Sequence, residues 1–193
     1  MSIVVAVEKD GRVAMAADTQ TSFGDVKVPP DNLRTCKINK LGSSYIGKTG
    51  WGLYDNIFSD FVDAKKAPSL LDETAIYTFF LRLWRRLHER YGFVNDQCRD
   101  KDSPFGDLDA SFLITNKNGI FHVASDMSVT RFAKYYAIGD GNDFALGALY
   151  SLYNFDYDAE TLAAKAVEAA MAFRIFCGGE IDTVVTRRAR TSR

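Results

Sequence analysis

The stretch MSIVVAVEKDGRVAMAADTQ, residues 1–20, decides the fold. Residues 3–7 are apolar and mainly β-branched, which is typical of a buried strand. Asp10 and Gly11 favour a hairpin turn, because both residues tolerate the positive φ angles that tight hairpins require. Residues 12–17 then read as a second strand, and Asp18 follows it directly. We therefore predict a β-hairpin that starts next to the amino terminus and ends at a carboxylate.

The same pattern returns in SFLITNKNGIFHVASD, residues 111–126. There an Asn-Gly turn joins two apolar strands, and an aspartate again follows the second strand. Two similar hairpins so far apart in the chain suggest two sheets, each built around one hairpin. The repeat has no short period, which argues against a solenoid.

Four other segments show the apolar spacing of amphipathic helices: residues 53–62, 76–91, 142–152 and 158–173. Gly92 is typical of a helix end and Asp158 of a helix start, and EIDTVVTRR, residues 180–188, returns as a strand. Each helix pair has one apolar stripe to bury, and each sheet has two faces. We therefore predict two stacked sheets with a layer of helices outside each.

Length and composition describe an ordinary globular chain. With 193 residues, 47% of them hydrophobic and 25% charged, we expect a single domain that spans residues 1–193. The net charge of -1 gives no reason to expect nucleic-acid binding. The cysteines are scattered without a CxxC pair, so we expect a reduced, cytoplasmic chain without disulfides. No segment has the pattern of a signal peptide or the length of a membrane span, so we expect neither.

Ser2 would stand at the amino terminus, directly before the first strand, once the initiator methionine is removed. A serine hydroxyl is a weak nucleophile near neutral pH and needs a base beside it. Neither His88 nor His122 lies in a serine-hydrolase motif, and the chain has no GxSxG. The α-amine is an alternative base, because its ordinary pKa of about 7.7–8.0 lies close to working pH. We therefore predict that Ser2 supplies both the nucleophile and the base.

Three further positions fit this chemistry. Lys37 is a candidate cation that would favour the neutral amine and the developing alkoxide. Asp18 could hold that lysine, since it ends the strand next to the first one. Gly50, in a turn predicted between a strand and a helix, is expected to open the helix that contains Asp55, and its N–H could point at the oxyanion of the tetrahedral intermediate. This chemistry requires no metal and no organic cofactor.

The order and spacing of these segments resemble the proteasome β-subunit and HslV family of N-terminal nucleophile hydrolases. The segments are the hydroxyl residue, IVVAV, DGRVAMAADTQT, KINKL, GKTGWGLYD and YAIGDG, and together they extend over about residues 2–185. The resemblance implies an α+β fold, a four-layer αββα sandwich, and homo-oligomeric rings with inward-facing active sites. Ser2 then matches the nucleophile. Asp18 and Lys37 match its charged partners, and Gly50 matches the oxyanion glycine.

The resemblance also implies how a peptide substrate would bind. Thr21, Ser22 and Gly52 fall where the family pairs its backbone with an extended substrate, a form of β-strand addition. Thr49 is assigned to the same substrate-binding group. Lys48 lies near the expected wall of the pocket for the P1 side chain, which would suit acidic or polar side chains.

Departures from the family pattern cluster at the same site. The nucleophile is Ser2 instead of threonine, so the methyl group that restrains the rotamer is missing and slower chemistry is expected. Asp140 replaces a serine that helps the terminal amine. Arg174 stands in place of an aspartate, and Cys177 stands where many members have serine. We predict that Asp140 hydrogen-bonds the Ser2 amine and that Arg174 pairs with Asp140.

The serine, these departures and the polar, acidic loop at residues 94–109 resemble a bacterial branch descended from HslV, the betaproteobacterial proteasome homologue. This resemblance implies a homo-oligomeric double ring, a dodecamer or a tetradecamer, that acts on peptides or unfolded proteins. The sequence leaves open whether the rings have six or seven subunits. It also leaves open whether an unfoldase ATPase is a partner.

Two other function classes fit parts of the sequence. GSSYIGKT, which begins at Gly42 and ends at Thr49, matches the phosphate-binding pattern GxxxxGK[ST] of nucleotide-binding proteins. That loop needs small turn residues, whereas Tyr45 and Ile46 favour a strand, and the N-terminal features would go unexplained. The third class is a catalytically inert ring subunit. A chain that starts directly on the strand favours the catalytic type, but the changed residues around the site keep the inert alternative open.

Overall fold

The computed structural model describes residues 2–33, 36–62, 68–91 and 108–189. The N-terminal hairpin lies at the centre of a four-stranded antiparallel sheet with the order β10-β1-β2-β11. Its strands are β1 (Ile3–Lys9), β2 (Arg12–Asp18), β10 (Tyr135–Gly139) and β11 (Ile181–Arg187). The predicted first hairpin is therefore confirmed, and the strand at the end of the chain extends the same sheet beside β2.

The second predicted hairpin belongs to a separate five-stranded sheet with the order β5-β6-β7-β8-β9. Its strands are β5 (Ile38–Leu41), β6 (Ser44–Gly50), β7 (Ala110–Asn116), β8 (Gly119–Val123) and β9 (Val129–Phe132). A short hairpin of β3 (Thr21–Phe23) and β4 (Val26–Val28) projects beyond β2, and a 3-10 turn, Pro30–Asn32, follows it. Two hairpins thus organise two sheets, as the sequence predicted.

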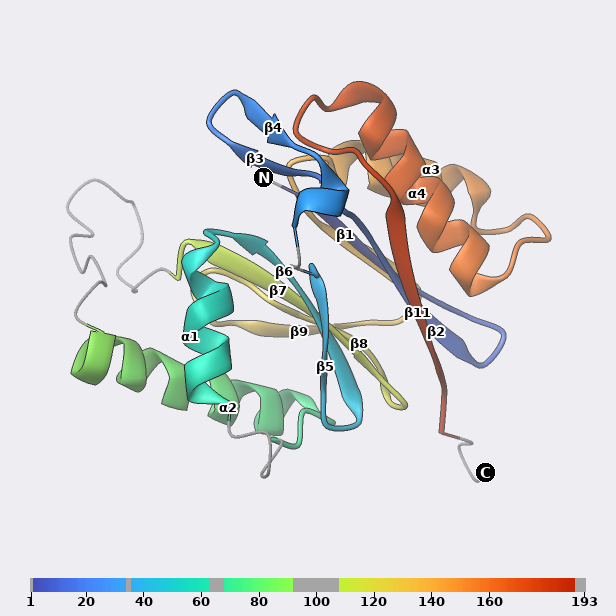
Figure 1. The fold of residues 1–193 in the computed structure, drawn as a ribbon. Coiled ribbons are helices and arrows are strands. Elements are labelled where there is room, and N and C mark those ends of the chain that lie inside the picture. Colours follow the sequence, from blue (N-terminus) through green and yellow to red (C-terminus); the bar gives the residue numbers. More distant parts are fainter. Residues whose placement is uncertain (1, 34–35, 63–67, 92–107, 190–193) are drawn as a thin grey trace.

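Helices cover the outer face of each sheet (Figure 1). They are α1 (Leu53–Phe61), α2 (Glu73–Arg86), which continues into a π-helical turn at Leu87–Tyr91, α3 (Asn142–Leu152) and α4 (Ala159–Phe173). Asp158 caps α4 as predicted, because its side chain accepts a hydrogen bond from the Thr161 N–H. Gly92, the predicted end of the second helix, and residues 94–107 of the predicted polar loop lie outside the described residues.

Strand β1 shows why the fold has four layers. Ile3, Val5 and Val7 pack in a cluster with α3 and α4, while Val4 and Ala6 point the other way into a cluster shared with the five-stranded sheet. A third cluster lies between α1, α2 and the outer face of the five-stranded sheet. The result is the predicted α+β, four-layer αββα sandwich, with β1 buried on both faces. That double burial explains its continuous apolar sequence.

The possible phosphate-binding loop, residues 42–49, is a turn and a strand. β6 pairs with β5 on one side and with β7 on the other, with Tyr45 opposite Thr115. A nucleotide-binding loop of this type must wrap around phosphate before a long helix, whereas a central strand has its backbone groups committed to its neighbours. At Gly47 a side chain would overlap Val4 of the facing sheet, so this glycine serves close sheet packing. The structure therefore does not support the nucleotide-binding alternative.

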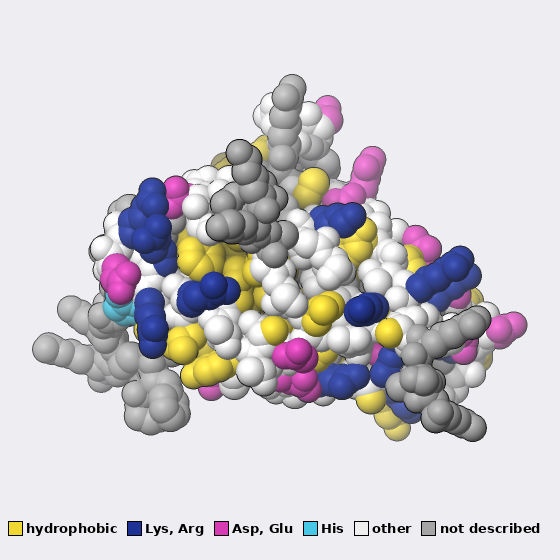
Figure 2. All heavy atoms as spheres, turned by 90° about the horizontal axis from the view of Figure 1, so that it is seen from below, with side chains coloured by type: hydrophobic (Ala, Val, Ile, Leu, Met, Phe, Trp, Pro, Cys, Tyr) yellow, Lys and Arg dark blue, Asp and Glu magenta, His cyan; other side chains and the backbone are white. Residues whose placement is uncertain are grey.

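Surface charge follows the near-neutral composition. On the face that Figure 2 shows, basic, acidic and apolar side chains are mixed. In the part of the chain that the structure describes, no helix is long and apolar enough to cross a membrane.

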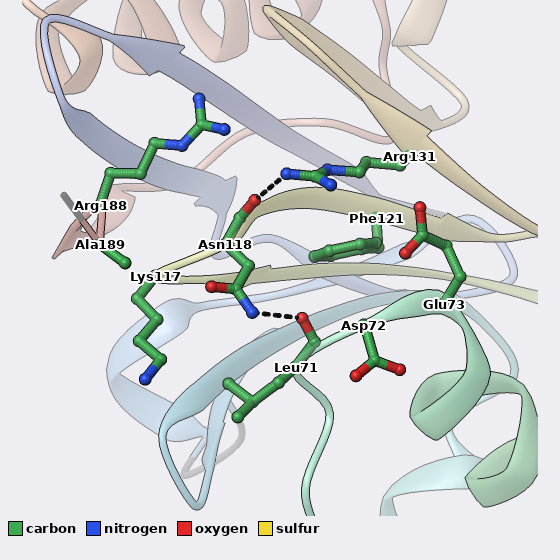
Figure 3. A pocket seen from close by; sticks show the side chains of 9 residues that line it. All are labelled: Leu71, Asp72, Glu73, Lys117, Asn118, Phe121, Arg131, Arg188 and Ala189. Atoms are coloured by element: carbon green, nitrogen blue, oxygen red, sulfur yellow. Dashed lines mark hydrogen bonds between the residues drawn. The ribbon is translucent and has the colours of Figure 1, made fainter. Parts of the chain in front are cut away.

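The end of β11 joins the two sheets. The Arg188 N–H donates to the Gly11 carbonyl at 2.9 Å, and the Ala189 N–H donates to the Lys117 carbonyl in the β7–β8 turn at 2.7 Å. The Arg188 guanidinium pairs with the carboxylate of Glu8, which is buried. Figure 3 shows Arg188, Ala189 and Lys117 along one side of a cavity of about 250 Å³. Arg188 and Ala189 therefore bind the turns of both hairpins.

Replacing Arg188 by alanine is expected to lower the free energy of unfolding by about 1–3 kcal/mol, because Glu8 stays buried without its cation. The loss should lie below that of a fully buried pair, since the Arg188 side chain is 36% exposed. Adding Glu8→Gln removes the uncompensated charge and should recover part of the stability. Denaturant unfolding of the single and double variants measures both effects. A double variant no more stable than Arg188→Ala would contradict this explanation.

Candidate active site

Asp18, at the end of β2, is the centre of the candidate site. Its side chain is fully buried and accepts three hydrogen bonds. Oδ1 accepts from the Ile3 N–H at 3.0 Å and from Lys37 Nζ at 2.6 Å, and Oδ2 accepts from the Gly178 N–H at 3.0 Å. A buried carboxylate with so many donors is held rigidly in place. Asp18 thereby ties together the start of β1, the segment before β5 and the segment before β11.

Lys37 lies directly before β5 and has two oxygen partners. Its Nζ donates to Asp18 Oδ1 and, at 2.7 Å, to the Gln20 carbonyl. Burial lowers the pKa of Lys37 from its ordinary value, and the Asp18 carboxylate opposes that shift. The predicted charge pair is therefore present, and it places a buried cation beside the start of β1.

Ser2 is held through the peptide group that joins it to Ile3. The next residue, Ile3, donates its N–H to Asp18, and the Ser2 carbonyl accepts the Asp140 N–H at 2.9 Å. Gly139 lies opposite Ile3 with φ +109°, and a side chain there would overlap the Ser2 carbonyl. Only glycine satisfies both conditions. The serine that the sequence singled out is thus anchored to Asp18 and Asp140 through its peptide bond with Ile3.

Asp140 and Arg174 meet as the sequence suggested. Arg174 follows the last residue of α4, and its Nε lies 3.8 Å from Asp140 Oδ2. The guanidinium also lies over the Phe144 ring, 5.5 Å from its centroid. Between Asp140 and Ser2, the observed hydrogen bond is the one between backbone groups. The predicted bond from the Asp140 carboxylate to the Ser2 amine stays a prediction.

Cys177 follows Arg174 by three residues and packs near Gly141, the residue after Asp140. Its side chain is buried, and its sulfur lies close to Gly141. Burial, with a smaller contribution from the Asp18 carboxylate, raises the pKa of the Cys177 thiol to about 11. A thiol that stays protonated at neutral pH is a poor nucleophile, so Cys177 acts as a small packing residue.

Gly50 does not open the helix, contrary to the expectation. It is the last residue of β6, pairs with Ala110 and has φ +126°. Backbone and side-chain atoms of Ala110 leave no room for a Cβ at this glycine. Trp51 follows, and Gly52 is the N-cap residue of α1. The helix therefore begins two residues later than predicted, with its N-cap at Gly52 instead of Gly50, because β6 stays paired with β7 up to Gly50.

The other predicted substrate-binding residues lie on two different strands, β3 and β6. Thr21 and Ser22 belong to β3, the strand that leaves the site after Gln20. Thr49 lies near the end of β6, and its methyl group approaches Gly139. The structure thus brings Thr49 to the segment that holds Ser2, and it places Thr21 and Ser22 just beyond Asp18 in the chain.

Lys48 lines a cavity of about 440 Å³ that is otherwise largely apolar. Ile46, Phe58 and Phe112 are among its other lining residues. Burial lowers the pKa of Lys48 to about 8, and its Nζ pairs with Asp55 of α1. The sequence suggested that Lys48 would favour acidic or polar side chains. With Asp55 beside it, the charge of Lys48 is already balanced within the chain.

Three residues of the site escaped the sequence reasoning: Gln20, Gly139 and Gly178. Each acts mainly through its backbone or through contacts with another backbone, which a residue pattern does not reveal. The features of the sequence that could have pointed to these residues are the Gly-Gly pair at residues 178–179 and the position of Gln20 two residues after Asp18. Among the described residues, no group of three or more His, Cys, Asp or Glu side chains could hold a metal ion.

Comparison with known proteins gives a consistent result. No family model matches the chain. BPH from Thiobacillus denitrificans in complex with epoxomicin is 33% identical, with a TM-score of 0.89 over 97% of this chain and 100% of that chain. Eukaryotic HslV from Trypanosoma brucei, 20% identical with a TM-score of 0.66 over 96% of this chain and 99% of that chain, shares the fold.

The relatives found by sequence are named HslV or proteasome subunit beta. The ATP-dependent protease subunit HslV of Rhizorhabdus wittichii is 26% identical over 180 residues, 90% of this chain and 86% of that protein. The proteasome subunit beta of Nanoarchaeum equitans is 26% identical over 188 residues, 94% of this chain and 91% of that protein. With the fold, the site and a structural relative of 33% identity over nearly the whole length, the chain belongs to the proteasome β-subunit and HslV family of N-terminal nucleophile hydrolases.

Proposed function

We propose that this protein is a peptidase subunit whose nucleophile is the Ser2 hydroxyl and whose general base is the Ser2 α-amine. One observation supports this most strongly. The Asp18 carboxylate binds both the N–H of the residue after Ser2 and the Lys37 ammonium, so the start of β1 and the buried cation share one anchor. Positioning of this kind gives an N-terminal hydroxyl the fixed geometry that nucleophilic catalysis needs.

The proposed reaction proceeds through an ester on Ser2. As the hydroxyl oxygen attacks the peptide carbonyl carbon, its proton passes to the neutral α-amine. The Lys37 cation favours the neutral amine and the forming alkoxide, and the Gly50 N–H stabilises the oxyanion. The ammonium then gives its proton to the leaving nitrogen as the C–N bond breaks. Water, activated by the same amine, hydrolyses the ester and frees Ser2. None of these steps uses a metal or an organic cofactor.

Asp140 and Arg174 take the supporting part in this proposal. The Asp140 carboxylate receives a hydrogen bond from the terminal amine, and Arg174, whose Nε lies 3.8 Å from Asp140 Oδ2, pairs with that carboxylate and orients it. Both the serine and the aspartate of the usual family pair are changed, yet the chain retains one acid and one hydrogen-bonding partner at this place. The pair therefore favours an active subunit over an inert one.

Peptide substrates would bind as an added strand between β3 and the segment at the end of β6. Thr21 and Ser22 of β3 form one edge, and Thr49 with Gly52 forms the other. Lys48 would contact the P1 side chain from the cavity that it lines. Since Asp55 offsets the charge of Lys48, we expect polar and apolar P1 residues to be accepted as well as acidic ones.

The assembly follows from the family. We expect residues 1–193 to form one proteasome-β-like domain and the subunits to form a cytoplasmic double ring, a dodecamer or a tetradecamer. Such a ring would hold peptide or unfolded-protein substrates inside, and an unfoldase ATPase would be a natural partner, as the name of the HslV relatives suggests.

Epoxomicin tests the function, because epoxyketones react with a hydroxyl and a free amine on the same residue. Assembled protein without Met1 is incubated with epoxomicin and its intact mass is recorded. We expect one adduct per chain, located by peptide mass spectrometry at Ser2. Protein that retains Met1 is the control, and it should stay unlabelled because its Ser2 nitrogen is an amide. No adduct on assembled, processed protein would favour the inert-subunit alternative.

A further inference from the structure

Gln20, which lies between β2 and β3, connects several parts of the candidate site. Its side chain is buried, and it is absent from the residues that the proposed reaction uses. We propose that Gln20 is a positioning residue: it holds the segment 174–178 against the Asp18–Lys37 pair so that Ser2 can react. This inference rests on the proposed peptidase function and adds a further residue to it.

The backbone of Gln20 contacts two parts of the site. Its carbonyl accepts a hydrogen bond from Lys37 Nζ at 2.7 Å, and its N–H donates to the Gly178 carbonyl at 2.9 Å. Gly178 in turn donates its own N–H to Asp18 Oδ2. Gln20 and Asp18 therefore hold Gly178 from both of its backbone groups. The position of Lys37 depends on the same short stretch of chain.

The side-chain amide of Gln20 holds the other end of this segment. Nε2 donates to the Ile175 carbonyl at 2.9 Å and to Ser22 Oγ at 3.3 Å. The side-chain oxygen fills the space that a Cβ at Gly178 would need. One amide thus braces the segment that follows α4 and also the strand that carries the predicted substrate-binding residues.

The braced segment matters because both of its ends reach the site. Arg174 at its start pairs with Asp140, and Gly178 at its end is bonded to Asp18. Ile175, between them, is 82% exposed, so its side chain does little to hold the segment. The hydrogen bond from Gln20 to the Ile175 carbonyl therefore has few substitutes. Without it, Arg174 at the start of the segment can shift relative to Ser2, although the backbone bonds of Gly178 remain.

A matched pair of variants tests this role. Gln20→Met keeps the length of the side chain and removes its two donated hydrogen bonds. Asn116→Leu is the control: Asn116 is a buried amide of the other sheet that donates to the Leu70 carbonyl at 2.6 Å and accepts from the Asn118 N–H at 2.7 Å. Both variants lose two hydrogen bonds of a buried amide side chain, but only the first loses them at the segment that connects Arg174 with Gly178.

The readout is the formation of the epoxomicin adduct on assembled protein, measured well below the melting temperature. At saturating inhibitor, we expect the first-order rate constant to fall at least about tenfold in Gln20→Met, because small displacements of reacting groups are costly. The half-saturating concentration should change less. Asn116→Leu should lower the melting temperature but stay within about twofold of the wild-type rate, since it lies in an independent part of the fold. Gln20→Glu, which also lacks the donating N–H, should behave like Gln20→Met and serves if the latter does not fold.

The outcomes separate the two proposals. A wild-type protein that forms no adduct would overturn the peptidase function and this inference together. A wild-type protein that reacts, with a Gln20→Met variant that reacts at the same rate, would overturn only the role of Gln20. Equal slowing in Gln20→Met and Asn116→Leu would also overturn it, because the effect would then be a general loss of stability.

Discussion

Replacing Ser2 by alanine is expected to abolish peptide hydrolysis, with a loss of at least about a thousandfold in kcat. The variant keeps the α-amine, the Asp18–Lys37 pair and the strand that carries residue 2. It lacks the oxygen that would attack the substrate. Hydrolysis of a fluorogenic peptide by assembled wild-type and variant protein, after removal of Met1 has been verified by mass, measures the difference.

Ser2→Thr is the matched control for this change. It restores a hydroxyl and adds the methyl group that restrains the rotamer, so we expect it to keep activity and to raise kcat by about 2–10-fold. The melting temperatures of the three proteins should be similar, because Ser2 precedes β1 and lies outside its core. Full turnover by Ser2→Ala would show that another group carries the reaction. Cys177 is a poor candidate for that group, since its raised pKa keeps the thiol protonated.

The fold could be predicted largely because each sheet is built around a local hairpin. Turn residues such as Asp10-Gly11, between apolar strands, act over a few residues, and the helices α1, α3 and α4 follow their apolar spacing closely. The charged pair of Asp18 and Lys37 could also be predicted, because the chemistry requires a cation beside the amine and a carboxylate to hold it. The structure places these two groups 2.6 Å apart.

The contacts that escaped prediction depend on tertiary neighbours. Gly139 must be glycine because its φ is positive and because the carbonyl of Ser2, far away in sequence, leaves no room for a Cβ. Lys48 was predicted to lie near the P1 pocket, but nothing in the sequence indicated that α1 brings Asp55 to its ammonium. In the same way, the extra pairing of β6 with β7 delayed the start of α1 beyond Gly50. Such effects follow from how elements pack, and a single sequence does not encode that packing in local spacing.

Asp18→Asn is expected to reduce the rate of Ser2 acylation by about a thousandfold and the free energy of unfolding by about 2–4 kcal/mol. Asp18 accepts from three donors through two oxygens. Asparagine has one acceptor oxygen, so in either orientation its NH₂ group faces the N–H of Ile3 or of Gly178. Lys37 also loses the carboxylate that opposes the effect of burial, so its pKa falls further below its ordinary value. Epoxomicin labelling and denaturant unfolding measure the two effects.

A double variant tests whether Asp18 and Lys37 act as one unit. Lys37→Met alone should slow acylation to a similar degree, since the cation is absent, while the Asp18 carboxylate keeps the N–H donors of Ile3 and Gly178. If the pair works together, Asp18→Asn with Lys37→Met should react within about tenfold of either single variant, because groups that act as a unit are not additive. Losses that multiply in the double variant would mean that Asp18 and Lys37 contribute independently. In that case the shared anchor at the start of β1 would not be what makes Ser2 reactive.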